Sequence, residues 1–156
     1  MSNFRFDASE LFGNLAQQQT RFKAAMELYA TNSATKLQNY ARQNRPWKDN
    51  THDARNRLNA DWEWRGNKIV IALSHGVDYG IYLEKGTPAH VIKGNPWLYW
   101  QGASHPVKQV NHPGTRPYPI IMPTIEHVGP QIMAGLTILL SRLSLIHISE
   151  PTRLRC

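Results

Sequence analysis

The sequence predicts one α+β domain, in which a long N-terminal helix and a C-terminal helix flank an antiparallel sheet of about four strands. Three observations predict this fold. Apolar residues recur every three or four positions at both ends of the chain, which is typical of helices that bury one face. Apolar and polar residues alternate in the middle around a Gly-Asn pair, which is typical of a β-hairpin. Tyrosines at helical spacing between these regions indicate a short central helix.

Residues 1–45 form the first segment of the chain, and a helix is predicted within it over about residues 7–44. Asp7 and Glu10 have the spacing of a capping box, and Pro46 cannot continue a helix. A helix of this length rises 1.5 Å per residue and would run past the core of a small domain. Two alternatives follow: the helix bends or breaks near residues 31–33, or its exposed part meets a neighbouring subunit.

The apolar stripe of this helix is narrow, so it can pack on one surface only. It is interrupted at Gln19, Ser33 and Lys36. Its members are Phe12, Leu15, Phe22, Met26, Tyr29, Leu37 and Tyr40.

Residues 46–59 have almost no apolar content and are predicted to form a mobile polar loop. A loop of this length is uncommon in a compact domain unless it is functional.

The sheet region is predicted over residues 60–122. It begins with a hairpin whose turn is Gly66-Asn67 and whose apolar positions are Ala60, Trp62, Trp64, Ile69, Ile71 and Leu73. Three short strands are expected after the central helix, at residues 91–92, 97–100 and 107–110, with an irregular extended connection at 113–117.

The last helix is predicted over residues 123–142, with Pro123 in its first turn. Ile125, Val128, Ile132, Met133, Leu136 and Leu139 recur at helical spacing and should close the core.

The central helix is predicted at residues 79–86. Tyr79, Tyr82 and Leu83 share one face, and Gly86 is placed to end the helix. From spacing alone, such aromatic residues are expected to pack against the sheet.

Two segments carry a resemblance to a known family. The first reads Y-x-x-Y-L-E-x-G-T from Tyr79 to Thr87, and the second reads R-P-Y-P-I-I-M-P-T from Arg116 to Thr124. Together they resemble signatures of the minor tail and tail-completion proteins of long-tailed bacteriophages, the phage minor tail protein Z group. The resemblance covers roughly residues 11–140. The family also has a T-G-x-L-R-x-S segment, which the stretch Thr51-His52-Asp53-Ala54-Arg55-Asn56-Arg57-Leu58 matches only loosely and without the glycine.

The resemblance implies a structural virion protein, a tail-completion or head–tail joining component in residues 1–142. It implies a homo-oligomeric ring, a hexamer, at the top of the tail, assembled in the host cytoplasm. The implied partners are other copies of the chain, other tail and head-connector proteins, and DNA passing through the lumen. Residues expected to act in fold and ring packing are Tyr79, Tyr82, Leu83, Glu84, Gly86, Pro117, Tyr118, Pro119 and Pro123. Residues expected to face DNA are Lys93, Lys108 and Arg116.

Charge and composition fit this implication. The 156 residues carry 18 lysines and arginines against 11 acidic residues, a net charge of +7, which favours a polyanionic partner such as DNA. RNA or an anionic membrane surface would satisfy the same charge. No apolar run approaches the roughly 18 residues that span a bilayer, so no membrane-embedded role is expected. The N-terminus has no apolar region typical of a signal peptide. The single cysteine, Cys156, excludes an internal disulfide.

No pattern predicts catalysis, a cofactor or a metal. His75, His90, His105 and His112 are spaced too widely for a typical zinc site, so surface or strand-edge positions are favoured. The chain lacks nucleophile and nucleotide-binding motifs. Glu84 is therefore expected to form an ion pair or cap a helix rather than act as a general base.

The alternative function is a small basic nucleic-acid-binding module that acts as a monomer or dimer. Lys85, Lys93, Lys108 and Arg116 share a segment with Trp97, Tyr99 and Trp100. Cations and aromatic rings can contact phosphates and stack on bases, although the rings could instead pack in the sheet. A metal-dependent nuclease that uses the histidines is a third hypothesis.

Residues 143–153 resemble the translation of a transposase sequencing adapter. Residues 143–156 are therefore treated as a non-native tail outside fold reasoning. Removing the tail's two arginines and one glutamate lowers the net charge by one unit, so the chain stays basic.

Overall fold

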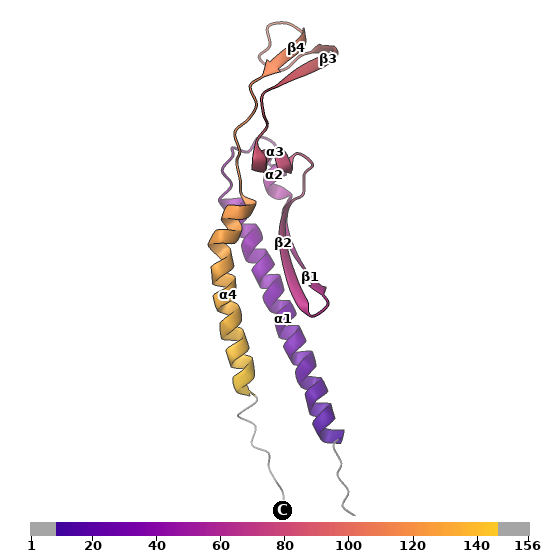
Figure 1. Cartoon of the computed structure of the whole chain (residues 1–156), viewed down its shortest axis with the longest axis vertical. Coiled ribbons are helices and arrows are strands. Elements are labelled where there is room, and N and C mark those ends of the chain that lie inside the picture. Colours follow the sequence, from indigo (N-terminus) through magenta and orange to yellow (C-terminus); the bar gives the residue numbers. More distant parts are fainter. Residues whose placement is uncertain (1–8, 147–156) are drawn as a thin grey trace, which may run out of the picture.

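The computed structural model describes residues 9–146 of an elongated α+β protein (Figure 1). The α+β class, the long N-terminal helix, the four strands and the C-terminal helix are confirmed within this range. In chain order the elements are α1 (Ser9–Gln43), α2 (Asp53–Asn56), β1 (Leu58–Arg65), β2 (Lys68–His75), α3 (Gly80–Lys85), β3 (His90–Leu98), β4 (Val107–His112) and α4 (Ile121–Ile146).

The four strands form two separate antiparallel hairpins, so the prediction of one sheet is wrong. β1 pairs with β2 and packs on α1, whereas β3 and β4 contact each other and have few contacts with other elements. Figure 1 shows the β3–β4 hairpin at the end of the molecule opposite the free ends of α1 and α4. The chain leading into β3 and out of β4 is extended, which carries this hairpin beyond the reach of β1 and β2.

The first hairpin follows its predicted pattern. Exposed and half-buried residues alternate along β1, because successive side chains of a strand point to opposite faces. The inner face lies on α1, where the indole N–H of Trp62 donates to Thr31 Oγ1 at 2.9 Å and that of Trp64 donates to Glu27 Oε1 at 3.0 Å. Gly66 has φ +62°, the left-handed conformation that a two-residue turn requires.

Helix α1 is unbroken from Ser9 to Gln43, so the alternative of a break near residues 31–33 is excluded. Small residues make most of its buried face: Ala30, Ser33, Ala34, Leu37 and Ala41. Ser33, expected to interrupt the apolar stripe, is only 4% exposed. Three of the large predicted stripe residues, Phe12, Leu15 and Phe22, are exposed instead. Packing here depends on small side chains that let neighbouring elements approach closely.

The core lies where the C-terminal half of α1 meets the first hairpin and the start of α4. Ala41, Leu58 and Ile120 are buried against one another. Trp47 and Leu73 pack around them.

Helix α4 begins at Ile121, two residues earlier than predicted, and continues to Ile146. Pro123 still lies in the first turn, where its missing N–H would have no partner within the helix. The helix packs on α1 through a stack of His127 on Tyr40, with ring centroids 4.6 Å apart, and through the Tyr29 hydroxyl, which donates to the carbonyl of Ile132.

The remaining segments differ from their predictions. Residues 46–59, predicted to be one mobile loop, contain α2 and the first residues of β1. The Arg42 guanidinium of α1 holds this segment by donating to the carbonyl oxygens of Asn56 and Leu58, both at 2.8 Å. The two strands predicted at 91–92 and 97–100 are replaced by the single strand β3, which ends at Leu98 and whose pairing with β4 is irregular between Lys93 and Leu98. The predicted capping residue Asp7 lies outside the described residues.

Candidate assembly interface

The two segments that carry the family resemblance lie side by side. Thr87 and Thr115 exchange backbone hydrogen bonds, each 3.0 Å between nitrogen and oxygen. The backbone N–H of Tyr118 donates to the carbonyl of Leu83 at 2.7 Å. Residues 83–87 and 114–121 are together named the clasp. The clasp joins the end of α3 to the start of α4.

Glu84 caps the N-terminus of α4. Its carboxylate accepts hydrogen bonds from the backbone N–H groups of Ile120, at 3.0 and 3.1 Å, and Ile121, at 2.7 Å. The same carboxylate lies 3.1 Å from Nε2 of the buried His75. A negative charge at a helix N-terminus is favourable, because the first N–H groups have no partner within the helix. Of the two expected roles of Glu84, helix capping is confirmed.

Two glycines make this contact possible. Gly86 has φ +70°, and a Cβ there would lie 2.4 Å from the carbonyl oxygen of Thr115. Gly114 has φ +86°, and its Cβ would lie 2.3 Å from the carbonyl oxygen of Thr87. Both positions therefore require glycine for conformation and for space. Gly86 also ends α3, as predicted.

The tyrosines beside the clasp do not fill the core. Tyr82 is 59% exposed and Tyr79 is 46% exposed, so the expectation that they pack against the sheet is wrong. With Leu83 and Tyr118 they line a mostly apolar groove of about 370 Å³, which His90 and other residues complete.

The prolines of the second segment keep it extended. Pro117 and Pro119 are exposed and flank Tyr118, and neither belongs to a helix or strand. Pro123, inside the first turn of α4, is also exposed. Proline fixes φ and removes an N–H donor, which favours this irregular connection over strand pairing.

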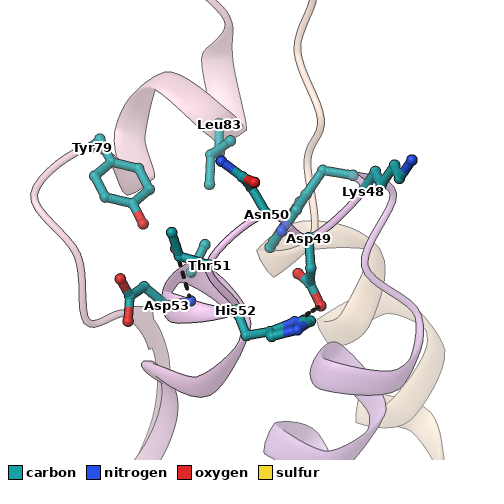
Figure 2. Close-up of a pocket in the computed structure, with 10 residues that line it drawn as sticks. Lys48, Asp49, Asn50, Thr51, His52, Asp53, Tyr79 and Leu83 are labelled. Atoms are coloured by element: carbon teal, nitrogen blue, oxygen red, sulfur yellow. Dashed lines mark hydrogen bonds and ion pairs between the residues drawn. The ribbon is translucent and has the colours of Figure 1, made fainter. Parts of the chain in front are cut away.

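A polar cluster on the other side of α3 was not predicted. The side chain of Asp49 is 5% exposed, and its Oδ2 contacts Arg45 at 2.7 Å, His52 at 3.1 Å and Arg55 at 3.2 Å. Figure 2 shows Asp49 and His52 beside a pocket of about 170 Å³ that Tyr79 also lines. No local pattern reveals the pair, because Arg45 and Asp49 lie between α1 and α2, outside any helix, where four-residue spacing does not bring side chains together.

Neighbouring charges and burial shift the pKa of the Asp49 carboxyl group in opposite directions. Burial alone raises the pKa of its carboxyl group. Hydrogen bonds from His52 and Arg45, together with the charges of Arg45 and Arg55, outweigh burial and hold the pKa below its ordinary value of 3.8. The carboxylate therefore stays ionised and organises the segment between α1 and β1.

His52 has an unusual backbone. Its φ is +66°, which makes it the only non-glycine residue with positive φ among residues 9–146. Left-handed conformation is costly for residues with a Cβ and free for glycine. His52 stands where the T-G-x-L-R-x-S signature has its glycine. The departure in sequence thus falls at a position whose conformation suits glycine.

The second hairpin, residues 90–112, is named the arm. No aspartate or glutamate occurs between Lys85 and Ile125, so the arm carries positive charge only. Trp97 is 54% exposed, and Tyr99 and Trp100 are exposed beyond the end of β3. The interpretation that these rings pack in a sheet is wrong.

The three cations expected to face DNA do not share one surface. Lys93 pairs with Gln109, so Lys108 lies on the opposite face of the arm. The Lys108 ammonium is 5.4 Å from the ring centroid of Trp97. Arg116 belongs to the clasp, where its guanidinium lies 4.8 Å from the ring centroid of Tyr118.

The predicted histidines do not converge. His90 and His112 face each other across the base of the arm, with ring centroids 5.1 Å apart, whereas His75 contacts Glu84 and His105 contacts Ser104. In the described part of the chain, no three potential ligands gather as a metal site would require. Nor is any helix there both long and apolar enough to cross a bilayer.

Both long helices have exposed apolar stripes. On α1 the stripe consists of Phe12, Leu15 and Phe22 and is named the α1 stripe. On α4 it consists of Met122, Ile125, Met133 and Leu140 and is named the α4 stripe. Nothing in residues 9–146 covers these side chains, which makes the two stripes candidate subunit contacts.

Comparison of the chain with protein-family models, with curated proteins and with solved structures found no match.

Proposed function

We propose that this chain is a structural virion protein, a tail-completion or head–tail joining component that forms a closed ring at the top of a long-tailed phage tail. The observation that carries the proposal is the apolar surface that one copy leaves uncovered. Phe12 is 68% exposed and Met133 is 61% exposed, although both lie on regular helices. Such side chains need a partner, because monomeric proteins rarely expose extended apolar patches.

The elongated shape of the described residues supports the same conclusion (Figure 1). An elongated protomer with free helices and a projecting arm is suited to head-to-tail contacts, which close into a ring when the rotation between copies closes.

The tail context comes from the resemblance, and two observations support it. The two motifs, 29 residues apart from Thr87 to Arg116, meet in the clasp through Glu84, Gly86 and Tyr118. In the segment that loosely matches T-G-x-L-R-x-S, His52 stands in place of the glycine and has a left-handed backbone conformation. The residues of the two motifs thus have roles in holding the fold and in shaping its surface.

The test is the mass and shape of the purified chain in solution. Light scattering after gel filtration, with negative-stain microscopy of the same fraction, is expected to show rings with a hole wide enough for duplex DNA. A chain that stays monomeric and binds free duplex DNA tightly would contradict the ring.

The lumen has its own test. Replacing Lys93, Lys108 and Arg116 with glutamine is expected to impair virion assembly or DNA delivery, because the two faces of the arm and the clasp lose positive charge that would attract DNA. The matched control replaces Arg21, Lys36 and Lys68, three exposed cations away from the arm, and removes the same charge. Equal effects of the two triple variants would contradict a lumen position for the arm.

One observation favours a second candidate, a basic nucleic-acid-binding module. The arm combines exposed Trp97 and Trp100 with Lys93 and Lys108, and it has no acidic residue. A monomer or dimer of this kind would bind duplex or single-stranded nucleic acid with an affinity that falls steeply with salt. A ring subunit is expected to bind free duplex weakly, and this difference separates the two functions.

A further inference from the structure

The groove beside the clasp has aromatic walls and lies between α3 and the base of the arm. Its volume of about 370 Å³ is within the range of pockets that hold small organic ligands. Three tyrosines line it, Tyr79, Tyr82 and Tyr118, together with His90 and His112. Because Tyr79 and Tyr82 are largely exposed, their rings are available to a partner outside the chain.

The two histidines of the groove present opposite hydrogen-bonding groups. Nδ1 of His90 lies 2.9 Å from the carbonyl oxygen of Pro88, which can only accept, so Nδ1 carries the proton and Nε2 of the neutral ring is an acceptor. Nδ1 of His112 accepts from the backbone N–H of Gly114 at 3.1 Å, so Nε2 of this ring carries the proton and is a donor. Within residues 9–146 neither Nε2 atom has a hydrogen-bond partner. The pair therefore offers one acceptor and one donor rather than two metal ligands.

Two cations lie near the groove. His90 pairs with His112, and alternate residues of β4 share a face, so Lys108 lies on the same face of the arm as His112. At about 3.3 Å per residue, it lies roughly 13 Å along the strand. The guanidinium of Arg116 lies over the ring of Tyr118, which lines the groove. A polymer bound in the groove could reach both cations, whereas a small ligand could not.

We infer that the groove holds an unpaired base of a single-stranded nucleic acid. Every base has a flat face that stacks on aromatic side chains such as the tyrosines. The Watson–Crick edge of an unpaired base has a donor beside an acceptor, which matches Nε2 of His90 and the Nε2–H of His112. The phosphates on either side of the base would meet Arg116 and Lys108. This inference rests on the second candidate function and names its ligand; it does not depend on the ring.

The charge of this region favours a nucleic acid over an apolar protein segment. Residues 86–124 contain three lysines and arginines and no aspartate or glutamate. The carboxylate of Glu84, next to this stretch, is already bound to the first N–H groups of α4 and to His75. An apolar side chain would cover the tyrosines but leave the two histidine nitrogens without partners, which is unfavourable for buried polar groups.

Binding of a fluorescent oligothymidylate, compared with an abasic oligonucleotide of the same length and with a DNA duplex, tests the groove. The oligothymidylate is expected to bind about tenfold or more tightly than the abasic strand at equal salt, since only the former has bases to stack. Equal affinities would overturn the inference and leave a backbone-binding module standing. A chain that binds none of the three at low salt would overturn both.

Replacement of Tyr82 locates the site. Tyr82→Ala is expected to weaken binding of oligothymidylate about tenfold and to leave binding of the abasic strand and the duplex unchanged, whereas Tyr82→Phe keeps the ring and should bind normally. Ile81→Ala is the matched control, because Ile81 is 54% exposed on the same helix and does not line the groove. Equal losses for Tyr82→Ala and Ile81→Ala would overturn the assignment of the groove.

Two further readouts separate the groove from other surfaces. Lys108→Gln should weaken binding of oligothymidylate more than Lys93→Gln, because Lys93 lies on the opposite face of the arm. The reverse order would place the strand on the other face and overturn the inference. Light scattering of Tyr82→Ala gives the second readout. A change in subunit number with unchanged affinity for oligothymidylate would make the groove a subunit contact and overturn the inference.

Discussion

The clasp and the arm adjoin each other in the chain, yet they are built on different principles. In the clasp, Glu84 accepts hydrogen bonds from two backbone N–H groups and contacts a buried histidine. The backbone packs so closely around position 86 that only glycine fits there. In the arm, β3 and β4 contact mainly each other, and Trp97 and Lys108 face solvent. The clasp determines the positions of α3 and α4, whereas the arm presents side chains to something outside the chain.

Residues of the clasp therefore act by stabilising the fold, whereas residues of the arm act by contacting a partner. A substitution in the clasp should change stability, and any loss of assembly would follow from that. A substitution in the arm should leave stability unchanged and alter binding or assembly directly.

Replacing Glu84 tests the strongest part of the clasp. Glu84→Ala is expected to destabilise the fold by about 3 kcal/mol, because it leaves the N–H groups of Ile120 and Ile121 and the ring of His75 without their acceptor. Glu84→Gln keeps one acceptor oxygen and should cost about half as much. Urea unfolding measures both.

The control for Glu84 is Glu126→Ala. Glu126 is exposed on α4 and makes no side-chain hydrogen bond or ion pair with residues 9–146, so its loss should change stability by less than about 0.5 kcal/mol. Similar losses for Glu84→Ala and Glu126→Ala would contradict the capping role.

Replacing Gly86 separates close contact from backbone strain. Gly86→Ala should cost about 2 to 3 kcal/mol, since the new Cβ would meet the Thr115 carbonyl at a position that already disfavours L-residues. Gly66 also has positive φ, but its surroundings are open, so Gly66→Ala should cost only about 1 kcal/mol. Equal costs in thermal unfolding would mean that the clasp tolerates a side chain.

Lowering the pH is expected to destabilise the fold through protonation of Asp49. Its pKa is lowered in the folded state, so its stabilising effect is complete above the ordinary pKa of 3.8 and is lost as pH falls through the lower folded value. Stability of the wild type should therefore decline on acidification below about pH 5 more steeply than that of Asp49→Asn. Parallel curves of unfolding free energy against pH would show that the cluster does not stabilise the fold.

The arm should give the smallest change in stability. Trp97→Ala with Trp100→Ala is expected to shift the unfolding free energy by less than about 1 kcal/mol, because both rings are largely exposed and only Trp97 has a cation contact, with Lys108. The same variant should impair ring assembly or nucleic-acid binding. A large loss of stability would mean that the arm belongs to the folded core and would remove the contrast with the clasp.

Much of the fold could be predicted because its helices and its first hairpin follow from the spacing of apolar residues and from turn residues close in the sequence. Alternation along β1 and the Gly66-Asn67 turn predicted the first hairpin with its buried face. Helical spacing predicted α1 and α4 to within a few residues at their described ends. The grouping of strands could not be predicted, because the second hairpin follows a pattern as local as the first and nothing in it says which strands will be neighbours.

The candidate site was predicted less completely. Glu84 and Gly86 were identified, and the motifs were expected to act in packing, but their meeting in the clasp depends on hydrogen bonds between residues more than 25 positions apart. The Asp49 cluster was missed because residues 46–59 look like a loop when judged by apolar content alone. Sequence spacing also could not show that Ile125 and Met133 belong to an exposed stripe while Val128 is buried.

Local sequence patterns are sufficient to predict the class of the fold, the basic character of the chain and the need for glycine at positions 66 and 86. These depend on backbone conformation and side-chain type, which act over a few residues. The tertiary structure alone decided which apolar face of each helix is covered and which is left for a partner. It also decided that Lys93 and Lys108 lie on opposite faces of the arm. Burial and register are set by contacts between distant segments, and a local pattern specifies an apolar face without specifying what will cover it.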